Sequence, residues 1–141
     1  MRTERGFSLI EMLIVVVIIG VIMALAVPGL QRARRYAQSG SAIQSLRTIT
    51  TAENLYERRY KVYASLADLA PEGTIDTNLG SGSKSGYSFS ITLPVDAKRF
   101  GSNADPVADG ASGVHFFVDD TAVIRYNEGV PADATSPPIP R

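Results

Sequence analysis

The feature that most constrains this chain is a run of 19 uncharged residues, 12–30, near its N-terminus. A helix rises about 1.5 Å per residue, so about 20 residues cross the hydrocarbon core of a bilayer, and this run is just long enough to span. Its β-branched residues would also suit a buried strand, but strands rarely exceed about 10 residues. We therefore predict a membrane-spanning helix.

A polar leader and one acidic residue distinguish this run from an ordinary anchor. Residues 1–6 form a short polar segment that ends in glycine, and Glu11 places a carboxylate in an otherwise apolar stretch. An ionisable group inside a membrane segment costs about 3 kcal/mol and marks a functional site that needs a partner. Cleavage between Gly6 and Phe7 would create that partner, because the new α-amino group of Phe7 is a cation close to Glu11.

The residues around the leader junction read Gly6-Phe7-Ser8-Leu9-Ile10-Glu11-Met12. Together with the apolar run, this motif resembles the cleavage and methylation signature of type IV pilins and type II secretion pseudopilins. The resemblance implies that a prepilin peptidase cuts after Gly6 and that Phe7 is N-methylated. It also implies that Glu11 pairs with the amino terminus of a neighbouring subunit. Pro28 falls where many pilins have a helix-breaking proline.

Two other interpretations of the N-terminus stay open. The first is a secretory signal peptide, because Ala24-Leu25-Ala26 is an A-x-A site after an apolar segment, and an exported soluble binding domain would follow it. Against this, Glu11 lies where a signal peptide should be apolar, and the run exceeds the usual length of about 7–15 residues. The second interpretation is a plain anchor helix.

The charges that flank the span disagree with the orientation that the leader motif implies. Three arginines follow the span and two precede it: Arg32, Arg34 and Arg35 against Arg2 and Arg5. Counting Lys and Arg alone slightly favours a cytoplasmic C-terminal side. We give the leader motif precedence over this count.

Helical spacing continues beyond the span. An apolar stripe recurs every three or four residues and consists of Ile43, Leu46, Ile49, Ala52, Tyr56, Tyr60 and Tyr63. The opposite side is predicted to carry the charged residues Arg47, Glu53, Glu57, Arg58 and Lys61. One helix is predicted from residue 7 to about residue 60, with a kink at Pro28-Gly29 because proline removes a backbone hydrogen bond. The resemblance implies that this segment can lose helicity in a filament.

The C-terminal part is predicted to form a small sheet. Residues 87–93 alternate and place four apolar side chains on one face. Residues 114–118 and 122–126 form two further strands, joined by a turn at Asp119-Asp120-Thr121. The fold class is therefore α+β: a long N-terminal membrane-inserted helix packed on a small antiparallel sheet of three to four strands.

Four segments follow from these elements. Residues 1–6 are the leader peptide, 7–30 the transmembrane and filament-core helix, 31–63 its amphipathic continuation, and 64–141 a globular head. The head ends in a proline-rich tail that contains Pro137, Pro138 and Pro140. We expect this tail to be extended or without regular structure.

No group of residues suits catalysis, so we expect no enzyme activity, cofactor or metal. His115 is the only histidine, and the absence of cysteine excludes disulfides and thiolate metal sites. The glycine- and serine-rich residues 80–86 lack the spacing of a phosphate loop. Four aspartates could offer oxygen ligands to calcium, as in some secretion pseudopilins, but turn formation explains them more simply: Asp105, Asp109, Asp119 and Asp120.

The resemblance and the balanced charge lead to a functional expectation. Lys plus Arg equals Asp plus Glu at 14 each, so no overall charge favours nucleic acid. We expect a structural subunit of a type IV pilus-like filament, polymerised through its N-terminal helix. The implied partners are further copies of the chain, prepilin peptidase, an inner-membrane assembly platform and, before assembly, membrane lipid.

The resemblance also implies where the chain resides. It would cross the bacterial inner membrane once before assembly and lie in an extracellular pilus afterwards. The alternative is a type II secretion pseudopilin that forms a short periplasmic filament.

Overall fold

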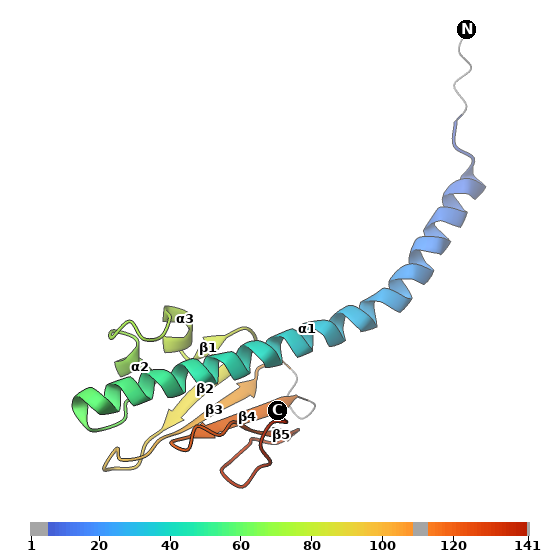
Figure 1. The fold of residues 1–141 in the computed structure, drawn as a ribbon. Coiled ribbons are helices and arrows are strands. Elements are labelled where there is room, and N and C mark those ends of the chain that lie inside the picture. The colour runs from blue at the N-terminus through green and yellow to red at the C-terminus, as the bar shows by residue number, and fades with distance from the viewer. Residues whose placement is uncertain (1–5, 109–112, 141) are drawn as a thin grey trace. The chain divides into compact units, whose positions relative to one another are not determined.

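The structure is a computed structural model that describes residues 6–108 and 113–140. Its helices are α1 (Leu9–Tyr60), α2 (Leu66–Leu69) and α3 (Thr77–Gly80). Its strands are β1 (Ser83–Lys84), β2 (Tyr87–Thr92), β3 (Gly101–Pro106), β4 (Val114–Asp119) and β5 (Arg125–Glu128), labelled in Figure 1. The chain forms two compact units, Met1–Ala37 and Gln38–Arg141.

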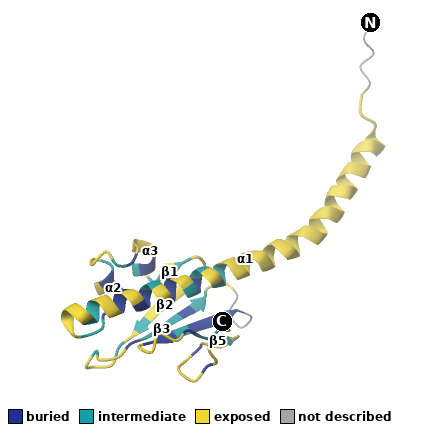
Figure 2. Ribbon diagram, viewed as in Figure 1, coloured by how far each residue is buried: buried dark blue, intermediate teal, exposed yellow. Residues whose placement is uncertain are grey.

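In the first unit, α1 is covered by no other described element. Every large apolar side chain from Leu9 to Leu30 is exposed, with exposed fractions of 44–86% (Figure 2). By length and composition, α1 could cross a membrane. The helix continues without a break through Pro28 and Gly29, so the proline does not end it.

The second unit packs the C-terminal half of α1 on one face of a sheet (Figure 1). The strands are antiparallel neighbours in the order β1-β2-β3-β4-β5. The core joins apolar side chains of both layers, including Ala42, Leu46, Ile49 and Ala52 from α1 and Tyr87, Phe89, Ala104, Phe116 and Val118 from the sheet. The α+β fold class is confirmed. The predicted helix stripe packs on the core except at Tyr60, which exposes 46% of its surface, and Tyr63 lies beyond the end of α1.

The sheet has five strands, whereas the sequence predicted three to four. The prediction missed two strands, β1 and β3. Strand β1 has only two residues and lies within the glycine- and serine-rich residues 80–86. Strand β3 has the sequence GSNADP, which is poor in β-formers, but it pairs with β2 and β4 on its two sides. The last strand begins at Arg125, three residues later than predicted. The turn before it is confirmed, because Ala122 N–H donates to the Asp119 carbonyl at 2.9 Å.

Short helices connect α1 to the sheet, and polar side chains cap them. Ser65 and Asp68 form a reciprocal capping box at the start of α2. Asp76 accepts a hydrogen bond from Leu79 N–H at the start of α3. Its Oδ2 atom also forms an ion pair with Lys84 Nζ at 2.5 Å. The Lys84 hydrogen bond and that cap lower the pKa of Asp76.

The proline-rich tail pairs with the head at Pro138, which fits the extended segment that was one of the two expected alternatives. Tyr126 N–H donates to the Pro137 carbonyl at 2.9 Å, and Ile139 N–H donates to the Ile124 carbonyl at 3.0 Å. Asp133 orders the turn before these contacts by accepting hydrogen bonds from the Thr135 hydroxyl and from the backbone N–H groups of Thr135 and Ser136, and these bonds lower its pKa. Backbone pairing with β5 therefore fixes the tail.

Candidate functional site

The predicted processing residues lie just before α1. Gly6, Phe7 and Ser8 have no regular secondary structure, and Leu9 is the first helical residue. Phe7 exposes 73% of its surface. The Gly6–Phe7 peptide bond therefore lies in a non-helical, exposed segment.

Glu11 lies in the first turn of α1, where its carboxylate and the Ser8 hydroxyl accept backbone hydrogen bonds at the start of the helix. Its Oε2 atom accepts a hydrogen bond from Ser8 N–H at 3.0 Å, and Ser8 Oγ accepts one from Ile10 N–H at 3.2 Å. The first N–H groups of a helix have no partner within it, and leaving them unpaired in lipid is costly. The positive end of the helix dipole also favours a carboxylate here.

The hydrogen bond from Ser8 N–H leaves Glu11 able to bind a second group. A carboxylate offers two oxygens with about four acceptor positions, and one hydrogen bond to Ser8 occupies only one of them. Glu11 can thus cap its own helix and still accept a cation from another molecule.

Ser8 is the functional residue that the sequence prediction missed. The signal was available, because Ser8-Leu9-Ile10-Glu11 is an S-x-x-E pattern before an apolar run. Glu11 was predicted only as an intramembrane charge, and its hydrogen bond with Ser8 at the helix start was not predicted.

Pro28 lies apart from these residues. It is an interior residue of α1, and 17 positions separate it from Glu11, which corresponds to roughly 25 Å along a helix. The structure therefore does not bring Pro28 into one site with Gly6, Phe7 and Glu11.

The aspartates considered for calcium have other roles in the head. Asp109 lies outside the described residues. Each of the other three has its own partner: His115 for Asp105 at 2.6 Å, Thr121 for Asp119, and Arg99 for Asp120 at 3.7 Å. Within residues 6–108 and 113–140, no group of three or more His, Asp and Glu side chains could hold a metal ion.

A different carboxyl is buried inside the head. Glu53, predicted on the charged side of the helix, is fully buried, and its Oε2 accepts a hydrogen bond from Ala64 N–H at 2.9 Å. Its Oε1 has no hydrogen-bond partner among the described residues. Burial raises the pKa of Glu53 to about 7, although the Ala64 hydrogen bond partly opposes this shift.

Comparison with known proteins gives two matches. Residues 1–27 match the family model described as the prokaryotic N-terminal methylation motif. The chain is also 29% identical, over 98% of its length, to the type IV major pilin protein PilA of Myxococcus xanthus (strain DK1622). The chain is therefore similar to a type IV pilin along nearly its whole length, and it spans 58% of the length of that relative.

Proposed function

We propose that the chain is a structural subunit of a type IV pilus-like filament. In this proposal, prepilin peptidase cuts after Gly6, Phe7 is N-methylated, and the subunits polymerise through their N-terminal helices. One observation carries the proposal. In α1, Glu11 accepts a hydrogen bond from Ser8 N–H at the helix start, and the residues after it expose an apolar surface that no described residue covers.

That apolar surface needs a cover in each state of the chain. Contiguous exposed apolar surface of this extent marks a membrane or protein interface. Before assembly, lipid covers the helix of a single-pass subunit in the inner membrane. After assembly, the helices of other copies replace the lipid, and the heads lie outside in the extracellular pilus.

In this proposal, Glu11 of one copy pairs with the amino terminus of a neighbouring copy. Cleavage leaves a positively charged amine on Phe7, and methylation retains that charge. A Glu11 carboxylate that is already ordered by Ser8 accepts the amine of a neighbouring copy. Pairing removes an uncompensated charge from an apolar filament centre, and this sets the axial register between copies.

The two matches support this proposal at both ends of the chain. The methylation motif covers the leader, the processing bond and the apolar run. The similarity to a protein named as a major pilin extends through the head.

Mass spectrometry of the mature N-terminus tests the processing step. We expect a chain from native cells to begin at N-methylated Phe7. A chain that begins at Val27 would show that the apolar run is a discarded signal peptide, and the filament proposal would then be wrong.

Three substitutions at the helix start separate the capping role of Glu11 from its charge. Glu11→Gln keeps an acceptor for Ser8 N–H but removes the charge, whereas Ser8→Ala removes half of the cap and keeps the charge. We expect Glu11→Ala and Glu11→Gln to be processed and yet to yield at least about ten-fold fewer filaments, counted by shearing and electron microscopy. Ser8→Ala should assemble, with a helix destabilised by about 1 kcal/mol.

Other outcomes point elsewhere. Abundant filaments from Glu11→Gln would show that the charge is dispensable and that capping alone matters. Loss of protein secretion on deletion of the gene, with no surface filament in the parent cells, would favour the alternative of a type II secretion pseudopilin.

A further inference from the structure

All the charged residues of α1 between Glu11 and Glu53 are positively charged. Between Glu11 and Glu53 the chain has no acidic residue, yet it has four arginines: Arg32, Arg34, Arg35 and Arg47. The first three fall within four consecutive positions directly after the apolar run. This basic cluster therefore directly follows the residues predicted to span a membrane.

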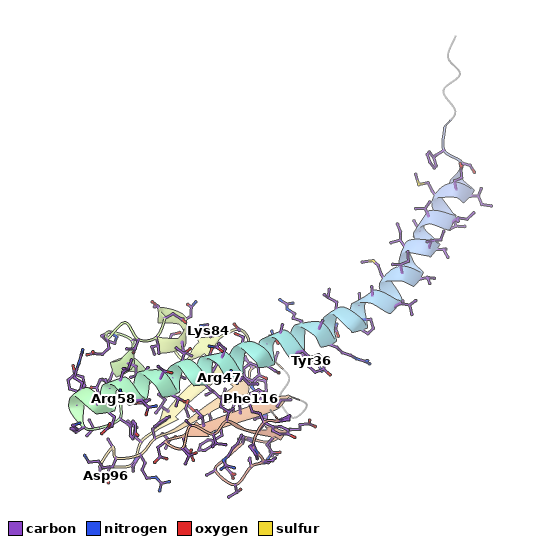
Figure 3. All side chains as sticks on the ribbon, viewed as in Figure 1. Tyr36, Arg47, Arg58, Lys84, Asp96 and Phe116 are labelled. Carbon is purple, nitrogen blue, oxygen red and sulfur yellow. The ribbon has the colours of Figure 1, made fainter. Side chains whose placement is uncertain are left out.

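The cluster occupies two sides of the helix and is followed by an aromatic residue. Arg32, Arg34 and Arg35 are exposed, and Tyr36, labelled in Figure 3, exposes 76% of its surface. Arg35 and Tyr36 lie three and four positions after Arg32, so these three side chains share one face of the helix. Arg34 lies on a different side. We call these four residues the basic collar.

The position of the collar matches the edge of the hydrocarbon. Arg32 lies two residues beyond Leu30, or about 3 Å along the helix. Arginine side chains extend toward the interface while their stems stay on apolar surface. Tyrosine is enriched at the same level of membrane proteins. The guanidinium groups thus reach the depth of the lipid phosphates when residues 12–30 span the bilayer.

We propose that the basic collar binds the phosphate groups of anionic phospholipids on the side of the membrane that faces the head. This inference rests on the membrane insertion proposed above. A guanidinium group is planar and can donate two parallel hydrogen bonds to one phosphate. Bound lipid would fix the depth of the helix before assembly. It would also account for arginines on the side of the span where the positive-inside rule does not expect them.

Lipid selectivity of the full-length chain tests the collar. The chain is solubilised in a neutral detergent, incubated with equal amounts of phosphatidylglycerol and phosphatidylcholine of identical acyl chains, and examined by native mass spectrometry. We expect bound phosphatidylglycerol to exceed phosphatidylcholine by at least about ten-fold, since each arginine near an anionic surface contributes roughly five-fold.

Two matched triple substitutions test which residues cause the preference for phosphatidylglycerol. Changing Arg32, Arg34 and Arg35 together to Gln should reduce the preference to about one. The control changes Arg47, Arg58 and Lys61 to Gln, which removes the same charge from exposed positions nearer the end of α1. This control should retain the preference. Equal loss in both variants, or no preference in the unmodified chain, would overturn the proposal.

Flotation with pure phosphatidylcholine vesicles separates this inference from the proposed function. A chain that does not float lacks the membrane insertion on which both proposals rest. A chain that floats but shows no selectivity contradicts the collar alone. A collar variant that keeps its selectivity but forms no filaments would show that the arginines contact a second copy of the chain and not lipid.

Discussion

Glu53 is a carboxyl group held in the apolar interior of the head. It lies in α1, and the hydrogen bond described for its side chain comes from Ala64 N–H in the segment that follows the helix. Burial raises the pKa values of Tyr56 and Tyr63, and the Glu53 charge adds a smaller contribution to each. Because burial removes the Glu53 carboxylate from water, its protonated form is favoured and its pKa rises to about 7.

The raised pKa predicts that the head becomes less stable as the pH increases. In the unfolded chain this carboxyl titrates near 4.5, and in the folded chain it titrates near 7. The folded state therefore binds more protons between these values, so the contribution is complete below about pH 4.5 and is lost as the pH rises through 7. Denaturant unfolding should give a free energy of unfolding roughly 3 kcal/mol higher at pH 4.5 than at pH 8 from this group.

Two glutamine variants test the assignment of this pH dependence. Glu53→Gln keeps an acceptor for Ala64 N–H and should remove most of the difference between the two pH values. Glu57→Gln, one helical turn later and only half-buried, should retain it. The assignment is wrong if both variants behave alike.

The residues of the N-terminal site were more predictable from sequence than Glu53 was. Gly6, Phe7 and Glu11 belong to a contiguous motif, and local chemistry at the helix start explains both their positions and the contact to Ser8. Glu53 is buried because Ala64, 11 residues later, returns over the helix. Helical periodicity describes one element and carries no information about that return.

At the scale of elements, the C-terminal tail contributes to the core. Ile139 packs against the buried apolar cluster, and its N–H donates to the Ile124 carbonyl. The Arg125 guanidinium also donates to the Ser136 carbonyl at 3.0 Å. Asn103 of β3 binds the Ala132 carbonyl at 2.8 Å. Side chains of two strands thus hold the tail in addition to the backbone pairing.

Truncation of Ile139 measures this contribution. Ile139→Ala retains the backbone hydrogen bond and removes apolar packing, so we expect a loss of about 1–2 kcal/mol in the free energy of unfolding. Val95→Ala is the control, because Val95 is fully exposed and should leave stability unchanged. Equal stability of both variants would show that the tail adds nothing to the core.

The elements differ in how far the sequence predicts them. The stripe of α1 and the alternation of β2 are local patterns that follow the periods of helix and strand, and both were predicted. Strand β3 has no such pattern. Its small residues Ser102 and Ala104 are fully buried, and neighbours on both sides determine its conformation. Non-local pairing of this kind is invisible in a six-residue window.

At the scale of the whole molecule, the chain consists of two units with different requirements. All core residues of the head lie at or beyond Ala42, within the second unit. The apolar surface of the first unit lies entirely before it. The head therefore has a complete hydrophobic core without the residues of the first unit.

A chain that begins at Gln38 tests this independence. We expect it to be soluble, monomeric by analytical ultracentrifugation and cooperative in thermal unfolding. Leu46→Ala in the same chain should cost about 2–5 kcal/mol, because Leu46 is fully buried. Aggregation or a gradual transition would show that the head needs the preceding helix.

The way the tail closes the sheet also matters when many heads are crowded together. An open β5 edge would present unpaired backbone groups to the next head, and such edges nucleate amyloid-like stacking. Here the tail already occupies backbone groups of Tyr126 and Ile124. Its own Pro137, Pro138 and Pro140 have no N–H to offer a further strand. In the filament proposed above, the β5 edge of one head is therefore not open for backbone pairing with the sheet of another head.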